Sequence, residues 1–301
     1  MNTLATEHMD PALHDLDLQS NQQILKRLVD SQQQAVVAVD HVIDDIALAV
    51  DAAAGRLATG VGRLVMVGAG ASGRLAVQDG AEMWPTFGWP HDRLLLCMAG
   101  GEPALLHSVE GIEDDASLAL QEVEKAAISQ DDVVLAVAAS GRSAWTCNWL
   151  KQSRSRGALT IGMANNQATP LLEIAAHSLW LDSGREVLAG STRMAAGTAQ
   201  KIALNVFSTT LMIRLNRTWG NLMVDMAASN KKLDDRRIRM LCEVLPKIDN
   251  LEAAEALEAA GGWVKLAALL ALGDSVETGT ARLDMHHGSL RAAIQSLNPD
   301  S

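Results

Sequence analysis

The stretch Arg63–Met83, RLVMVGAGASGRLAVQDGAEM, passes from a short apolar run through a glycine-rich turn into a helix-like segment. The run Arg63–Val67 is too short for a typical helix, and the turn Gly68–Arg74 follows it directly. A glycine-rich turn between a strand and a helix exposes backbone N–H groups, and the start of the helix adds partial positive charge. The sequence therefore predicts an anion-binding turn at the carboxyl end of a strand.

The same alternation of short apolar runs and helix-like stretches continues along the chain. The further runs are Arg93–Met98, Val133–Ala138, Ala158–Met163 and Ser178–Leu181, and the helix-like stretches are Leu75–Met83, Ala116–Ala127, Ala144–Lys151 and Leu171–Ala175. Strands that alternate with helices form a parallel sheet that is covered on both faces. We therefore predict an α/β fold in which residues 60–185 form a five-stranded, doubly wound parallel sheet.

Helices are predicted on either side of this sheet in the chain. Two helices precede it, and the second carries one apolar stripe at three- and four-residue steps, formed by Val36, Val39, Ile43, Ile46, Val50, Ala53 and Leu57. After Gly190 the expected helices are Arg193–Leu215, Ala227–Val244, Leu251–Ala260, Trp263–Leu272 and Ser289–Ser296. We expect residues 1–59 to form an N-terminal helical segment, residues 60–225 the sheet domain, and residues 226–301 a helical appendage.

Composition and charge exclude several function classes. Hydrophobic residues make up 48% of the 301 residues, and the formal net charge is -11, which disfavours nucleic acid as a partner. The acidic amino terminus lacks an apolar signal core, and no uncharged apolar run has the length of a membrane span. The three cysteines, Cys97, Cys147 and Cys242, match no zinc or redox pattern and fit a reducing cytoplasm. We expect a cytoplasmic protein that binds neither membrane nor nucleic acid.

A second turn resembles the first. The predicted third strand ends in Ala138-Ala139-Ser140-Gly141-Arg142-Ser143, and carboxyl ends of parallel strands lie at the same edge of a sheet. We expect both turns to hold one phosphate, through Gly70, Ser72, Gly73, Arg74, Ser140, Gly141, Arg142 and Ser143. The pattern GAGASG also matches a dinucleotide-binding turn, but no acidic residue ends the second strand, where a ribose partner is expected.

Carboxylates follow the first two strands. Glu82 ends the helix after the first turn and is followed by apolar residues, Met83-Trp84-Pro85 and Phe87. Apolar surroundings raise the pKa of a carboxyl group, as a general acid requires near neutral pH. Glu113 lies with other acidic residues in Glu110-Gly111-Ile112-Glu113-Asp114-Asp115, after the second strand.

Several long motifs resemble those of N-acetylmuramic acid 6-phosphate etherases, which have the sugar isomerase (SIS) fold and are related to the glucokinase regulatory protein. The motifs are GAGASGRLAVQDGAEMWPTFG (68–88), AGGEPALLHSVEGIEDD (99–115), AASGRS (138–143), EVLAGSTRMAAGTAQK (186–201) and GNLMVDMAASNKKL (220–233). The resemblance implies that Glu82 and Glu113 are the two catalytic carboxylates. It implies removal of D-lactate in cell-wall amino-sugar recycling, by a homodimer without a metal or redox cofactor.

The chain departs from the family pattern at four positions. Met83 and Trp84 replace a cysteine and a proline, Ala71 replaces a threonine, and Ala195 replaces a lysine. These departures leave both glutamates in place but concern the shape of the pocket. Two alternatives therefore stay open: a non-catalytic sugar-phosphate-binding regulator, and a sugar-phosphate isomerase of the same fold.

Overall fold

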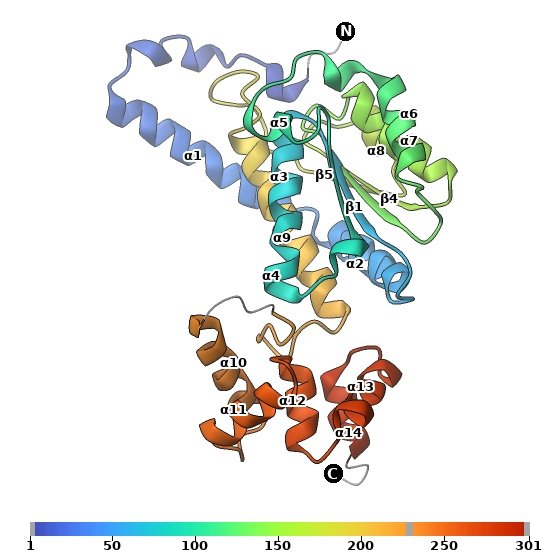
Figure 1. The fold of residues 1–301 in the computed structure, drawn as a ribbon. Coiled ribbons are helices and arrows are strands. Elements are labelled where there is room, and N and C mark those ends of the chain that lie inside the picture. Colours follow the sequence, from blue (N-terminus) through green and yellow to red (C-terminus); the bar gives the residue numbers. More distant parts are fainter. Residues whose placement is uncertain (1–3, 227–230, 298–301) are drawn as a thin grey trace. The chain divides into compact units, whose positions relative to one another are not determined.

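Five short strands form one sheet (Figure 1). The computed structural model describes residues 4–226 and 231–297, without the side chains of residues 231–233. The strands are β1 (Leu64–Gly68), β2 (Leu94–Met98), β3 (Val133–Val137), β4 (Leu159–Ala164) and β5 (His177–Trp180). They lie in the order β2-β1-β3-β4-β5, and all four pairings are parallel. The predicted five-stranded parallel sheet is confirmed.

The chain divides into two units. The first comprises residues up to Ala81 together with His91–Thr209, and the second comprises Glu82–Pro90 together with residues from Thr210 onward. The first unit contains the sheet and the helices η1 (Ala5–Glu7), η2 (Pro11–Leu13), η3 (Leu16–Leu18), α1 (Asn21–Asp40), α2 (Ile43–Leu57), α3 (Gly70–Ala81), η4 (His91–Arg93), α5 (Pro103–Leu106), η5 (Ile112–Asp114), α6 (Ala116–Lys125), α7 (Ala144–Ser155), α8 (Pro170–Ile174) and most of α9 (Ala195–Arg214).

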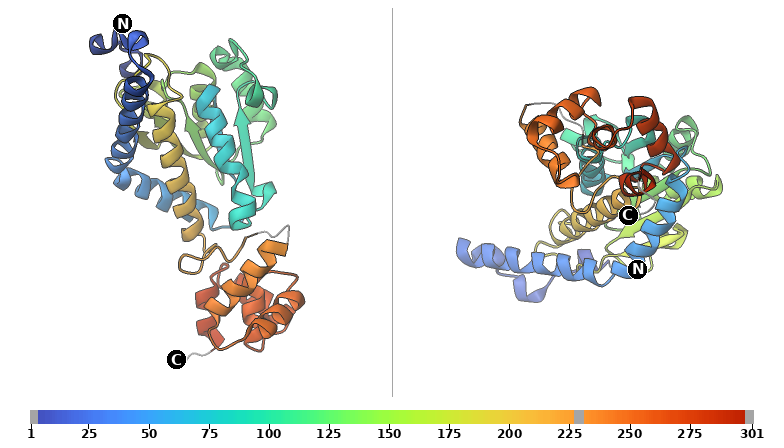
Figure 2. Two further views of the ribbon diagram at one scale, coloured as in Figure 1. Left: turned by 90° about the vertical axis from the view of Figure 1, so that its left-hand side faces the viewer. Right: turned by 90° about the horizontal axis from the view of Figure 1, so that it is seen from below.

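Helices cover the sheet on both faces, as the apolar character of its strands requires. Every residue of β1 and β3 is buried, although successive side chains point to opposite faces. On one face, Val65 and Val134 pack in a core with Trp145 and Trp149 of α7. On the other face lie α2, α3 and α9 (Figures 1 and 2). This arrangement is a doubly wound sheet.

The predicted apolar stripe before the sheet is divided between two helices. The chain leaves the helix at His41 and Val42, so α1 ends at Asp40 and α2 begins at Ile43. Two members of the stripe lie off the buried face: Val36 is 59% and Ile43 is 54% exposed. The later members of the stripe stay buried on α2.

The second unit is a helical bundle with its own core. Its helices are α4 (Met83–Phe87), α10 (Lys231–Val244), α11 (Asn250–Ala259), α12 (Val264–Ala271), α13 (Val276–Met285) and α14 (Leu290–Leu297). The later stretch of this unit starts at Thr210, and Val224 packs in the core of the bundle. The expected boundary between residues 225 and 226 stays a prediction. The predicted start of α10 at Ala227 lies outside the described residues. Among the described helices, none is both long and apolar enough to span a membrane.

Candidate active site

The turn between β1 and α3 is built by glycines at positions that disfavour a larger residue. Gly70 has a φ of +55°, in the left-handed region that L side chains rarely adopt, and it begins α3. One turn later, Gly73 packs against the end of β1, where an added Cβ would lie 2.5 Å from the carbonyl oxygen of Gly68. This close packing brings the positive end of the α3 dipole to the carboxyl edge of the sheet. The turn therefore has a form that suits an anion, and its role in phosphate binding stays a prediction.

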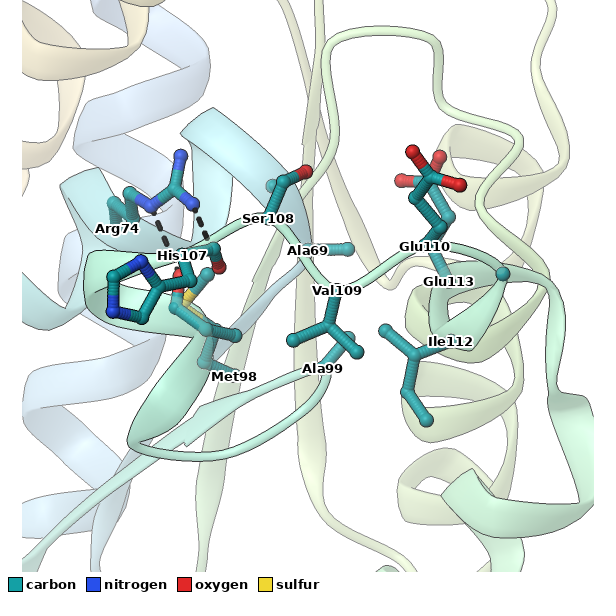
Figure 3. A pocket seen from close by; sticks show the side chains of 13 residues that line it. Ala69, Arg74, Met98, Ala99, His107, Ser108, Val109, Glu110, Ile112 and Glu113 are labelled. Carbon is teal, nitrogen blue, oxygen red and sulfur yellow. Dashed lines mark hydrogen bonds between the residues drawn. The ribbon is translucent and has the colours of Figure 1, made fainter.

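A pocket of about 250 Å³ lies beside this turn (Figure 3). Gly70 and Arg74 line it from the turn and α3, and His107, Glu110 and Glu113 line it from the loop after β2. In Figure 3, Arg74 and His107 lie at one side of the pocket, and the two glutamates lie at the other. The pocket thus combines a helix start with two carboxylates.

Arg74 fixes the loop that carries Glu113. Its Nε donates to the carbonyl oxygen of Ala104 at 3.0 Å, and its Nη2 donates to that of His107 at 3.3 Å (Figure 3). The guanidinium group is therefore engaged with the loop while it lines the pocket. Its predicted role as a ligand of the phosphate stays a prediction.

The serine turn after β3 is joined to both sides of this pocket. Ser72 is buried, and its Oγ accepts the N–H of Ala139 at 3.3 Å, which links the two turns. Ser143 begins α7 and donates from its Oγ to the carbonyl oxygen of Glu113 at 3.2 Å. These bonds hold the serine turn beside the loop that carries Glu113.

The remaining predicted phosphate ligands lie at the tip of the serine turn. Ser140 is half-buried, and its Oγ accepts the N–H of Arg142 at 3.2 Å. Gly141 has a φ of +62°, so the backbone reverses there, and the Arg142 side chain is exposed. The turn thus offers a hydroxyl group and a cation near the pocket, and their role in phosphate binding stays a prediction.

The acidic residues after β2 have different surroundings. Glu110 and Glu113 are exposed and line the pocket, with the left-handed Gly111 between them. Asp115 instead begins α6, where its carboxylate accepts the hydroxyl and N–H of Ser117 and the N–H of Leu118. The hydrogen bond from the Ser117 hydroxyl and those from the backbone lower the pKa of Asp115. Glu110 and Glu113 are therefore the carboxylates available to a ligand of this pocket.

Glu82 belongs to the second unit. It occupies the N-cap position of α4 and is exposed, whereas Met83 and Phe87 are buried. These buried neighbours leave the Glu82 side chain exposed, so the apolar surroundings expected for its carboxyl group are not observed. The sequence placed Glu82 correctly at a helix end but did not show which way its neighbours point.

Sequence reasoning missed His107 as a residue of the pocket. His107 is exposed and lines the pocket next to Ser108. The signal that could have found it is its position, because it lies in the same loop as Glu110 and Glu113, after the second strand. Within the described parts of the chain, no group of three or more histidine, cysteine, aspartate or glutamate residues is arranged to hold a metal ion.

Two family models match this fold, and both describe SIS domains. Residues 45–151 match the glucokinase regulatory protein N-terminal SIS domain, and residues 112–209 match the SIS domain. Together they span the sheet, both glycine turns and the loop with Glu113. The first unit is therefore an SIS domain, the class that the doubly wound sheet and its paired turns define.

Relatives over the full length identify the family. An N-acetylmuramic acid 6-phosphate etherase from Deinococcus radiodurans is 43% identical, covering 96% of this chain and 94% of its own. Etherases of the same name from Rubrobacter xylanophilus and Erwinia tasmaniensis are 40% and 41% identical, each covering 98% of this chain, and 97% and 96% of their own. The chain belongs to the N-acetylmuramic acid 6-phosphate etherase family.

The four departures from the family pattern are not among the residues that line the pocket. None of Ala71, Met83, Trp84 and Ala195 lines it. Met83 is buried in the second unit, and Ala195 is buried where its N–H donates to the carboxylate of Glu186. The side chains that line the pocket are therefore not themselves among the four changed residues.

Proposed function

We propose that this chain removes D-lactate from N-acetylmuramic acid 6-phosphate and yields N-acetylglucosamine 6-phosphate. The observation that carries the proposal is full-length similarity to etherases, and a pocket lined by both Gly70 at the start of α3 and Glu113 supports it. Both glutamates that the family motif implies, Glu82 and Glu113, are present. A regulator requires the phosphate turns but has no need for an acid–base pair, so the glutamates favour catalysis.

The proposed chemistry requires two carboxyl groups. When the sugar ring opens, the aldehyde at C1 makes the proton at C2 acidic, and Glu113 removes this proton. The C2–C3 double bond forms as the C3–oxygen bond breaks, and Glu82 protonates the oxygen of the departing lactate. Water then adds across the double bond, with its oxygen at C3 and a proton at C2. These reaction steps need no change of oxidation state in the protein.

A direct assay tests the activity. Purified protein incubated with N-acetylmuramic acid 6-phosphate is expected to release D-lactate and N-acetylglucosamine 6-phosphate in equal amounts. A sugar-phosphate isomerase would exchange the C2 proton and convert aldose to ketose without lactate release. A regulator would bind the sugar phosphate without turnover. Either of these two results would contradict the proposed function.

We expect Ser140→Ala to weaken the binding of the phosphorylated sugar roughly tenfold, because one charge-assisted hydrogen bond to phosphate is lost. Isothermal titration with N-acetylglucosamine 6-phosphate measures this change. Ser155→Ala is a matched control, because Ser155 is exposed at the end of α7 and donates to the carbonyl oxygen of Gln152. Equal affinity in the Ser140 variant and the control would remove Ser140 from the phosphate site.

The exposed apolar face of α1 supports a homodimer. Leu25, Val29 and Val36 lie on one side of the helix and are 61%, 61% and 59% exposed. Figures 1 and 2 show α1 extending away from the sheet. An apolar helix face of this kind is stabilised when a second copy covers it.

The three free cysteines and the phosphorylated substrate also agree with a cytoplasmic location.

We expect the double variant Leu25→Glu/Val29→Glu to raise the dissociation constant of this dimer roughly 100-fold, because it buries two charges in an apolar interface. Sedimentation velocity over a range of concentrations measures the change. The control Lys26→Glu/Asp30→Lys exchanges two charges of an exposed ion pair on the same helix and should leave the dimer intact. A wild-type chain that is monomeric and fully active would overturn the dimer proposal.

A further inference from the structure

The segment Glu82–Pro90 is held in the second unit by groups far away in the sequence. Its helix α4 has only five residues, Met83–Phe87, and a helix of this length is unstable in isolation. Met83 and Trp89 are each 1% exposed, so the segment is buried around them while Glu82 remains exposed. The position of the Glu82 carboxyl group therefore depends on the contacts of the residues that follow it.

A buried ion pair between Lys265 and Asp225 lies in the same unit. Lys265 of α12 donates from Nζ to Oδ2 of Asp225 at 2.5 Å and to the carbonyl oxygen of Asn216 at 2.7 Å. The Asp225 and Lys265 side chains are 4% and 7% exposed. Burial raises the pKa of Asp225 and lowers the pKa of Lys265, because each charged form loses its hydration. Removal of Asp225 leaves the Lys265 charge buried without its carboxylate partner, which is strongly unfavourable.

Arg217 joins this pair to the Glu82–Pro90 segment. Its Nη1 lies 3.5 Å from Oδ2 of Asp225 and donates to the carbonyl oxygen of Gly88 at 3.4 Å. Its guanidinium carbon lies 5.5 Å from the centroid of the Trp89 ring, within the range of a cation–π interaction. One arginine thus contacts the carboxylate and two consecutive residues of the segment.

The backbone of Asp225 contacts the segment directly as well. Gly88 ends α4 with a φ of +58°, and its N–H returns to the carbonyl oxygens of Met83 and Trp84. A Cβ added at Gly88 would lie 2.4 Å from the carbonyl oxygen of Asp225. The segment is therefore clamped between its own helix end and the backbone of Asp225.

We infer that Asp225, with Arg217 and Lys265, is a positioning residue for the reaction, which fixes the Glu82–Pro90 segment and thereby orients the carboxyl group of Glu82. This inference rests on the proposed catalytic role of Glu82. The ion pair and the arginine lie at the far end of α4 from Glu82, so they act through the helix and not on the substrate.

The test is Asp225→Asn, which keeps the shape of the side chain and removes its charge. We expect kcat for lactate release to fall roughly 10- to 100-fold, because small displacements of a catalytic group have effects of this size. In Glu82→Gln, lactate release is expected to fall more than exchange of the C2 proton with deuterated water. We expect Asp225→Asn to shift the ratio of these two rates in the same direction. Arg217→Lys, which keeps the charge but loses the planar contact with Trp89, should show the same pattern more weakly.

A double-variant cycle separates positioning from general stability. In the Glu82→Gln background, Asp225→Asn should slow lactate release no further, because the group that it orients is already absent. Asp274→Asn is the control: it removes the Asp274–Arg282 ion pair, at 2.8 Å in the same unit, and should leave the ratio of lactate release to C2 exchange unchanged.

Two results would overturn the inference. One is a wild-type rate in Asp225→Asn; the other is additive slowing in the double variant, at a folded fraction that circular dichroism shows to be normal. If Asp225→Asn does not fold, Arg217→Lys decides by the same two criteria. A wild-type chain that releases no lactate would instead contradict the proposed function itself.

Discussion

Glu113→Gln is expected to abolish both lactate release and exchange of the C2 proton with deuterated water. The proposed base acts before the ether bond breaks, so its loss stops the reaction at the first step. General base catalysis contributes roughly 10²- to 10⁴-fold, and we expect a fall in kcat of at least about 10³-fold. The amide is nearly isosteric with the carboxylate, so the loop should keep its hydrogen bonds through the backbone carbonyl of Glu113 to Ser143.

Two neighbouring variants make this result specific. Asp114→Asn changes the adjacent exposed carboxylate, which does not line the pocket, and should keep both activities. Glu110→Gln changes the other carboxylate of the pocket and should keep C2 exchange. Deuterium at C2 is measured by mass spectrometry of recovered substrate, and lactate by an enzymatic assay. Loss of exchange in Glu110→Gln, with exchange retained in Glu113→Gln, would assign the base to Glu110.

The sheet was predictable because its inner strands are buried on both faces. A parallel strand of this kind appears as an unbroken apolar run, and β1 and β3 are buried at every position. Helix α13 was missed for the opposite reason. Its sequence, VETGTARLDM, has no clear apolar stripe and includes a glycine and two threonines, which have low helix propensity. Its capping box, Ser275 with Thr278, is the local signal that marks its start.

The site was predictable only where local sequence determines the structure. The glycine turn before α3 follows from a few adjacent residues. The bond of Ser72 to Ala139 spans 67 residues of sequence, and that of Arg74 to Ala104 spans 30, so no local pattern indicates them. Membership of Glu82 in the second unit depends on contacts such as Arg217 with Gly88, which are 129 residues apart.

Glu82→Gln is expected to lose lactate release while it keeps part of the C2 exchange. The amide cannot give a proton to the departing oxygen, so the ether bond stays intact after the base has removed the C2 proton. We expect kcat for lactate release to fall roughly 10²- to 10⁴-fold, with a smaller effect on the exchange rate. Both rates are measured in the same deuterated reaction, so a change in protein concentration or folded fraction affects them equally.

The contrast with Glu113→Gln decides which of the two carboxyl groups is the general base and which is the general acid. Both side chains are exposed, so neither is distinguished by burial. Glu255→Gln removes an exposed carboxylate from α11 in the same unit as Glu82 and should keep both activities. Exchange lost in Glu82→Gln and retained in Glu113→Gln would reverse the roles, and full activity in Glu82→Gln would remove this residue from the mechanism. Glu82→Gln should block only the departure of the C3 oxygen, whereas Glu113→Gln should block the earlier removal of the C2 proton. A substrate analogue with a better leaving group at C3 should therefore recover part of the rate in Glu82→Gln but none in Glu113→Gln.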